Sequence, residues 1–379
     1  MSAIKKHSFV ILPHWRIEGG AGYYIRDLIV SLRTAGTVQV AGPYAGDYDE
    51  APMQSEDLDK LTLQIFPTYE GIRLAAILYH ILISALQTIA LIATPLDKRF
   101  KGRFDALVLT SSVQVMAVPI ARRLFPGRPI AIVVQENVCL SRGLGRLTRF
   151  FLKRADVVVS ITETWAQHAR DNGLDPVVLP NNYSPDYAAP KHNRDPAIES
   201  DLLYVGGGAT IKGFNNLIAA LPALLNVPGR RIFCLGHYSE AAIKTLEKVR
   251  DDAHPDAQLN IIGLVPDIRP YLRGTELLLL PIDSPHFCRP AIEAGLFGKT
   301  FLIPDFPELA EFASNGVNCI TYRADDPVDF LSKATYLLDN PLIKKKLSAG
   351  NEVVSARYFC SHNSSTMATK ILAKMQKNR

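Results

Sequence analysis

The stretch LLYVGGGATIKGF, residues 202–214, passes from an apolar segment through a glycine-rich turn into a helical pattern. Leu202–Val205 is predicted to be a buried strand, and Phe214–Leu225 a helix. Glycines between them let the backbone approach a ligand closely, beside the free N–H groups of a helix start. These features are typical of α/β domains that bind phosphate where a strand ends. The glycines are Gly206, Gly207, Gly208 and Gly213.

Lys212, at the end of this loop, would bring a flexible positive charge to a diphosphate. The loop is not a Walker loop, because a glycine follows the lysine and no serine or threonine is placed to bind magnesium. The alternative is a lysine that lies in solvent just before a helix.

Strands and helices alternate in the same way along the rest of the chain, which predicts an α/β fold with two parallel, Rossmann-like sheets. The other predicted strands are Ser8–Leu12, Val38–Ala41, Ala106–Leu109, Ile130–Val134, Val157–Ile161, Arg231–Leu235, Leu259–Ile262, Leu277–Pro281 and Thr300–Ile303. A polar, proline-containing linker is predicted over residues 180–196. We therefore expect an N-terminal domain over 1–185, a C-terminal domain over 186–352 and a C-terminal helix within 353–379.

The composition is that of a globular protein, with 47% hydrophobic and 21% charged residues. The net charge of +5 argues against bulk binding of nucleic acid, although local basic patches could meet phosphates or anionic lipid. The five cysteines are scattered and form no CxxC pair, which indicates neither a disulfide framework nor a zinc site. No secretory signal is predicted, and we expect a cytoplasmic protein.

Leu74–Thr94 contains no charged residue, and the basic residues Lys98, Arg99, Lys101 and Arg103 follow it. A core helix and an interfacial membrane helix are both compatible with this pattern, whereas a spanning helix is the least favoured interpretation. A second set of basic residues falls at helical spacing and would form one face of a helix. That face could be exposed to solvent, or it could lie near a membrane. It consists of Arg142, Arg146, Arg149 and Lys153, with Leu147, Phe150 and Phe151 nearby.

Residues 281–295 combine a strand end, a polar loop and a helix that starts near Pro290. His286 and Arg289 lie in the loop, and Arg289 could pair with phosphate. Glu293 is expected in the first turn, where it could accept the hydroxyls of a ribose or simply favour the helix start. The turn Gly19–Gly22 could likewise face a ligand or only shape a strand-to-helix turn, because Ile25 replaces the third glycine of a dinucleotide fingerprint.

These stretches together resemble the GT-B glycosyltransferases, specifically the large retaining family four of bacterial polysaccharide and lipopolysaccharide assembly. The resemblance covers nearly the whole chain. It rests on residues 155–163, 179–182, 205–214, 263–267, 287–298 and 305–316.

The resemblance implies two Rossmann-like domains that face each other across a cleft, with the acceptor on the N-terminal domain and the sugar donor on the C-terminal one. It further implies sugar transfer from a nucleoside-diphosphate sugar to a glycan or lipid-linked acceptor, without metal or cofactor. The C-terminal helix would cross back to the N-terminal domain. Catalytic roles would fall on Glu293, Lys212, Arg289 and Glu136. The donor would contact Gly19, Gly20, Gly22, Gly207, Gly208, Lys212, Gly236, Leu264, Val265, His286, Phe287, Arg289, Pro290 and Glu293.

The chain departs from this family at three places. Pro285 stands where the first of two glutamates is usual, and Gly207 stands where the glycine-rich loop carries an arginine. The segment Gln135-Glu136-Asn137 replaces a histidine of the N-terminal domain. A non-catalytic binding module of the same fold is therefore the alternative to an active transferase.

Overall fold

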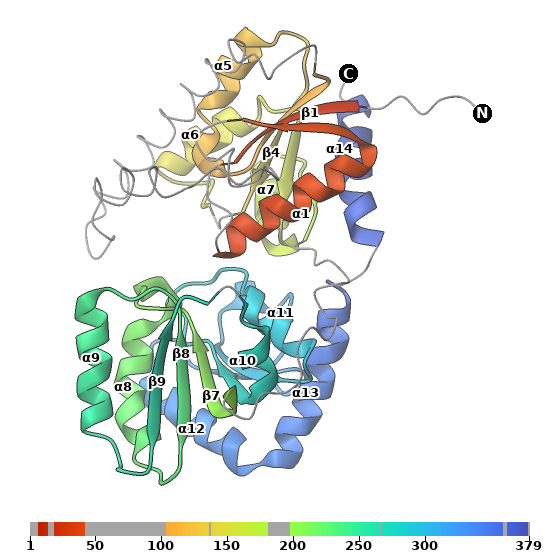
Figure 1. Ribbon diagram of the computed structural model, residues 1–379. Coiled ribbons are helices and arrows are strands. Elements are labelled where there is room, and N and C mark those ends of the chain that lie inside the picture. The colour runs from red at the N-terminus through yellow and green to blue at the C-terminus, as the bar shows by residue number, and fades with distance from the viewer. Residues whose placement is uncertain are drawn as a thin grey trace. The chain divides into compact units, whose positions relative to one another are not determined.

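The computed structural model contains two six-stranded sheets, one in each of two units (Figure 1). Unit 1 is Met1–Ser184 with Ser361–Arg379, and unit 2 is Pro185–Cys360. The structure describes residues 7–13, 19–41, 104–135, 138–180, 198–265, 267–358 and 362–377. The predictions for Leu74–Thr94, for nearly all of the linker and for Glu136 lie outside these residues.

The sheet of unit 1 has the strand order β2-β1-β3-β4-β5-β6, and its described pairings are all parallel. The central strands read as unbroken apolar runs because helices cover both faces of a parallel sheet. The strands are β1 (His7–Leu12), β2 (Gly36–Val40), β3 (Ala106–Leu109), β4 (Ile130–Val134), β5 (Val157–Ser160) and β6 (Val177–Val178).

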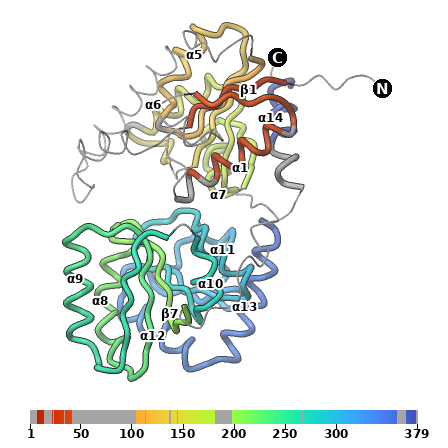
Figure 2. The backbone as a smooth tube through the Cα atoms, viewed as in Figure 1, coloured from red at the N-terminus to blue at the C-terminus, as the bar shows by residue number. Residues whose placement is uncertain are grey.

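Helix α1 (Gly19–Ala35) packs beside α14 (His362–Lys377), so the last helix of the chain belongs to unit 1 (Figure 2). Ile371 is fully buried, and the backbone N–H of Ala368 donates to Ser31 Oγ of α1 at 3.3 Å. The other helices among the described residues of the unit are α5 (Ala117–Leu124), α6 (Leu144–Leu152), α7 (Glu163–Asp171) and the short 3-10 helix η2 (Ser112–Gln114).

The sheet of unit 2 has the order β12-β11-β10-β7-β8-β9, again with parallel pairings. Successive strands run outward from β7 to β9 and then return to the other side at β10. The strand order therefore reverses between β7 and β10, which is where open α/β sheets bind ligands. The strands are β7 (Ser200–Val205), β8 (Arg231–Leu235), β9 (Gln258–Gly263), β10 (Thr275–Leu279), β11 (Thr300–Pro304) and β12 (Ile320–Tyr322).

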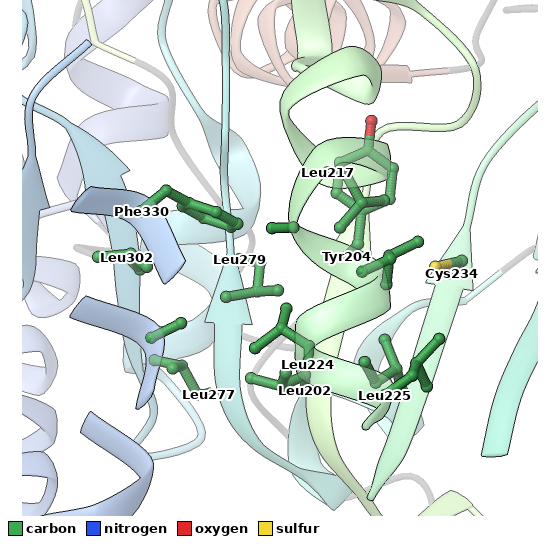
Figure 3. Packing of buried hydrophobic residues seen from close by; sticks show 14 of the residues in the cluster. Leu202, Tyr204, Leu217, Leu224, Leu225, Cys234, Leu277, Leu279, Leu302 and Phe330 are labelled. Carbon is green, nitrogen blue, oxygen red and sulfur yellow. The ribbon is translucent and has the colours of Figure 1, made fainter. Parts of the chain in front are cut away.

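Helix α8 (Phe214–Leu225) packs against α9 (Glu240–Asp251) and α12 (Pro327–Asp339), while α11 (Arg289–Gly295) packs against α13 (Pro341–Ala356). The short α10 (Arg269–Gly274) precedes β10. Leucines of the strands meet α8 and Phe330 of α12 in one apolar core (Figure 3). Two 3-10 helices, η5 (Thr210–Lys212) and η6 (Pro307–Leu309), lie in loops that follow strands.

The predicted fold class, two Rossmann-like α/β domains, is confirmed by the two sheets. Besides shifts of one or two residues at several strand ends, three features differ from the sequence predictions. The glycines Gly19–Gly22 lie within α1 rather than in a turn before it. The C-terminal helix expected within 353–379 is two helices, because residue 353 falls inside α13 and α14 begins at His362. Two short strands, β6 and β12, were not predicted at all.

Candidate functional site

Two loops meet at the point in unit 2 where the strand order reverses. One loop joins β7 to α8 and the other joins β10 to α11. The N–H of Asp283 donates to the carbonyl of Ile211 at 3.3 Å, and Asn216 Nδ2 donates to Asp283 Oδ1 at 2.9 Å and to the carbonyl of Pro281 at 3.2 Å. These bonds hold the two loops together.

The first loop depends on a glycine at its end. Gly213 adopts a φ of 77°, and a Cβ placed on it would lie 1.5 Å from the carbonyl oxygen of Pro281. Tyr204 lies beneath the loop and donates from its hydroxyl to the carbonyl of Gly207 at 2.9 Å. The sequence predicted glycine here for close approach to a ligand, and the structure shows close approach to the neighbouring loop.

Gly213→Ala should destabilise the protein more than a matched glycine substitution elsewhere. Gly229 has a similar φ of 71°, and a Cβ added there would have no other atom within 4 Å, so Gly229→Ala isolates the backbone strain. That strain should cost about 1–2 kcal/mol. The clash at Gly213 should add about 1–3 kcal/mol. Urea unfolding of both variants measures the difference, and equal losses would contradict the assigned contact.

Lys212 and His286 meet across the two loops. Lys212 Nζ lies 2.7 Å from His286 Nε2, and His286 Nδ1 lies 2.9 Å from the carbonyl oxygen of Ser284. A carbonyl only accepts, so Nδ1 carries the proton and Nε2 accepts from the Lys212 ammonium. The thiol of Cys288 lies 3.6 Å from the same Nε2. The histidine is thus a neutral acceptor that directs the lysine.

The electrostatics of this cluster favour an anionic ligand. Burial lowers the pKa of Lys212 below its ordinary value. No salt bridge from Lys212 to a carboxylate is found within the described ranges of the chain. An ammonium with two N–H donors beyond the one given to His286 would gain a partner from a phosphate, which would restore its pKa.

His286 is expected to contribute an acid-sensitive part of the stability. Burial, reinforced by the nearby Lys212 ammonium, lowers the pKa of His286 from 6.5 to about 3. The unfolded chain therefore binds this proton at higher pH than the folded chain does. The contribution is present above pH 6.5 and is lost as the pH falls toward about 3. His286→Gln should flatten the decline of unfolding free energy across that window in urea titrations, and an unchanged slope would count against it.

Arg289 and Glu293 form a buried ion pair in α11. Their exposed fractions are 6% and 4%, and Arg289 Nε donates to Glu293 Oε1 at 3.2 Å. Burying two charges is costly, and an arginine four residues before a glutamate runs against the helix dipole. The pair therefore gains little for the helix from its order along the chain. It lies directly after the second loop.

The expectation that Glu293 lies in the first turn of its helix is wrong. Helix α11 begins at Arg289, which makes Glu293 its fifth residue, and the first turn contains no acidic side chain. Pro290 occupies the start of the helix, as predicted. The simple explanation of Glu293 as a helix cap therefore fails, because the carboxylate is engaged by Arg289.

Two polar side chains of α13 donate hydrogen bonds to the backbone of α11. The sequence did not reveal this contact. Asn351 Nδ2 donates to the carbonyl of Ala291 at 3.0 Å, and Ser355 Oγ donates to the carbonyl of Ile292 at 2.7 Å. Both residues are fully buried. Their spacing of four residues predicts that both lie on one face of a helix, but it does not identify the helix that this face contacts.

The remaining donor-site predictions in unit 2 lie along the same carboxyl edge of the sheet. A Cβ on Gly236 would lie 2.3 Å from the N atom of Gly207, so the ends of β7 and β8 touch there. Phe287 packs against the rings of Phe312 and Tyr358, at centroid distances of 5.3 and 5.6 Å. Gly208 follows β7 and donates its N–H to the carbonyl of His237, whereas Leu264 and Val265 follow β9, Leu264 being 67% exposed.

The predicted residues of the N-terminal domain belong to unit 1. Gly19, Gly20 and Gly22 lie in the first turn of α1. Glu136 lies outside the described residues, while its neighbour Gln135 donates from Nε2 to the carbonyl of Thr110 at 2.9 Å.

Two other kinds of feature are absent from the described part of the chain. No group of three or more His, Cys, Asp or Glu side chains there is arranged to hold a metal ion. No helix among the described residues has the length and apolar character needed to cross a membrane.

Two sequence families match the chain, one in each half. Residues 19–182 match the family described as Glycosyl transferase 4-like domain, and residues 199–340 match the family described as Glycosyl transferases group 1. No curated protein sequence matches the chain significantly.

Several solved structures have a similar fold. HepE of Anabaena in complex with UDP-glucose gives a TM-score of 0.67 at 14% identity, covering 97% of this chain and 99% of that one. Sucrose-phosphate synthase of Thermosynechococcus elongatus gives 0.73 at 14% identity, covering 98% and 100%. A glycosyltransferase of Rickettsia africae gives 0.67 at 13% identity, covering 99% and 100%. Likeness at these identities shows a common fold of two Rossmann-like domains.

Proposed function

We propose that this chain, a glycosyltransferase with the GT-B fold, moves a sugar from a nucleoside-diphosphate sugar to a glycan or lipid-linked acceptor with retention of configuration. The observation that supports this most directly is the position of Lys212. Its ammonium has no carboxylate partner among the described residues, and it bonds to His286 at the point where the strand order of the sheet reverses. A diphosphate matches that charge. The UDP-glucose complex of HepE supports the same class of donor.

The proposed mechanism is electrostatic. Lys212 stabilises the negative charge that develops on the diphosphate as the bond to the sugar breaks. Glu293 accepts hydrogen bonds from the ribose hydroxyls, and Arg289 holds that carboxylate in place. Backbone N–H groups at the start of α8 supply further donors, so the proposal requires no metal.

The first unit would take the acceptor and the second the donor. Cell-surface polysaccharide or lipopolysaccharide assembly is the proposed setting, on the cytoplasmic side of the membrane. This part rests on the family resemblance and on the two matched domains.

Donor choice can be tested by thermal shift with a panel of nucleoside-diphosphate sugars, because a bound ligand stabilises the native state in proportion to its occupancy. The preferred donor is then incubated with membrane extracts or glycans as acceptors, and release of free nucleoside diphosphate is measured. The anomeric configuration of the product, read by NMR, tests retention. An inverted product would overturn the stereochemical proposal while leaving the transfer itself intact.

A second candidate function is a binding module without turnover. Pro285 and Gly207, which replace the usual glutamate and arginine, favour this alternative. Both functions allow donor binding, so binding alone does not separate them. Diphosphate release in the presence of acceptor supports the transferase, and tight donor binding with no release over the full acceptor panel supports the module.

A further inference from the structure

Helix α6 of unit 1 presents a basic and aromatic surface. We define it as Arg142, Arg146, Arg149, Lys153 and Arg154 together with Leu147 and Phe150. Residues 142–154 contain five basic residues and no acidic one, so this short segment is strongly positive.

The apolar members of this surface are unusually open to solvent. Phe150 is 50% exposed and Leu147 is 44% exposed, whereas Leu152, on the opposite side of α6, is fully buried. At 100° per residue, Phe150 and Leu147 lie directly beside the arc formed by Arg146, Arg149 and Lys153, while Arg142 precedes the helix and Arg154 follows it. The exposed half of the helix thus carries a basic arc and an apolar arc side by side.

The basic side chains are available for an external anion. No salt bridge links any of the five to a carboxylate within the described residues. Arg146 Nε donates to the carbonyl of Ser141 and Arg149 Nη1 to Asn172 Oδ1, which orient the two guanidinium groups without neutralising them. The Arg154 guanidinium lies 3.6 Å from the ring centroid of Phe150 and so adds positive charge beside the exposed ring.

We propose that this surface of α6 docks the protein onto an anionic lipid bilayer. Cationic groups meet the phosphate headgroups, and Phe150 and Leu147 insert among the upper acyl carbons, as in amphipathic interfacial helices. A nucleic acid would also match the charge. Two exposed apolar side chains beside a basic arc fit a bilayer better than they fit a phosphate backbone.

Vesicle flotation of the full chain tests the proposal without any assay of sugar transfer. Wild-type protein should float with vesicles of phosphatidylcholine and phosphatidylglycerol in equal parts and should not float with phosphatidylcholine alone. Each basic residue near such a surface contributes about fivefold to binding. The triple variant Arg142→Gln, Arg146→Gln and Lys153→Gln should therefore bind roughly 100-fold more weakly.

A control triple variant carries the same change of charge on unit 2. It replaces Lys244, Lys345 and Lys346, all exposed, with glutamine and should float like the wild type. Phe150→Ser tests whether this side chain inserts into the bilayer. Insertion is supported if the binding of this variant to vesicles becomes fully salt-sensitive. All replaced side chains in the α6 variants lie at the surface, so unchanged melting temperatures verify the fold.

Three results would overturn the proposal. The first is no flotation of the wild type with anionic vesicles. The second is equal loss of binding in the α6 and control variants, which would show a response to net charge alone. The third is binding of duplex DNA that depends on the α6 residues while vesicles are ignored, which would assign the surface to nucleic acid.

Discussion

Lys212→Ala should lower the rate of sugar transfer by about 100- to 1,000-fold, the usual effect of removing one preorganised group that stabilises developing charge. The reason lies in the geometry of the two loops. Nζ is directed by His286 Nε2 at 2.7 Å, at the position where a strand ends and α8 begins. Because the charge on the diphosphate grows as the sugar departs, the loss should fall mainly on kcat.

Lys248→Ala is the matched control, because Lys248 is exposed on α9 of the same unit. It should transfer sugar at the wild-type rate. His286→Ala should give a smaller loss than Lys212→Ala, since the lysine keeps its charge but loses its direction. A wild-type kcat in Lys212→Ala, with the fold intact by circular dichroism, would remove this residue from the proposed mechanism.

Glu293→Leu should have two separable effects, one on stability and one on turnover. It leaves the Arg289 guanidinium buried without its carboxylate, which should lower the free energy of unfolding by about 3–5 kcal/mol. Turnover should also collapse, since the carboxylate proposed to hold the ribose is gone. Chemical denaturation and diphosphate release measure the two effects independently.

The double variant Arg289→Met with Glu293→Leu distinguishes these effects. Replacing a buried ion pair by apolar side chains of similar volume is often neutral for stability, so the double variant should recover most of the lost stability. It should remain inactive. Recovery of both stability and turnover would show that the pair is structural only, and failure to recover stability would show that the pair is not the reason for the loss.

The long apolar patterns predicted the fold well. The helix Phe214–Leu225 and the strands Ala106–Leu109, Ile130–Val134 and Arg231–Leu235 have the predicted bounds. Buried strands of a parallel sheet are continuous apolar runs, and α8 has its apolar residues at helical spacing, so the local pattern and the tertiary environment agree.

Short or interrupted elements could not be predicted in the same way. Strand β6 has two residues and β12 has three, too few for a period to be recognised. The end of α13 was not predicted because the helical spacing that indicated the tail helix, Met367, Ile371 and Met375, lies wholly within α14. The glycines Gly19–Gly22 suggested a turn from their weak helix propensity, yet α1 includes them because the packing of its later turns outweighs that preference.

The candidate site, like the fold, could be predicted only in part. The types and places of Lys212, His286, Arg289 and Glu293 followed from the loops that carry them. Their partners did not, since Lys212 and His286 are 74 residues apart and Asn351 is 60 residues from Ala291. Lys212 and His286 come together because β7 pairs with β10, and Asn351 reaches Ala291 because α13 packs against α11. The sequence also assigned Arg289 to a phosphate, whereas in the structure its Nε bonds to Glu293.

The packing of α14 on α1 has a consequence for how the protein is made. The first unit requires residues near both ends of the chain, while every described element of the second unit lies between Ser200 and Ala356. During synthesis, the second unit can therefore complete its sheet while the first still lacks α14, which packs on α1 and bonds to its Ser31. The order of domain completion on the ribosome is then the reverse of the usual one, in which the N-terminal domain folds first.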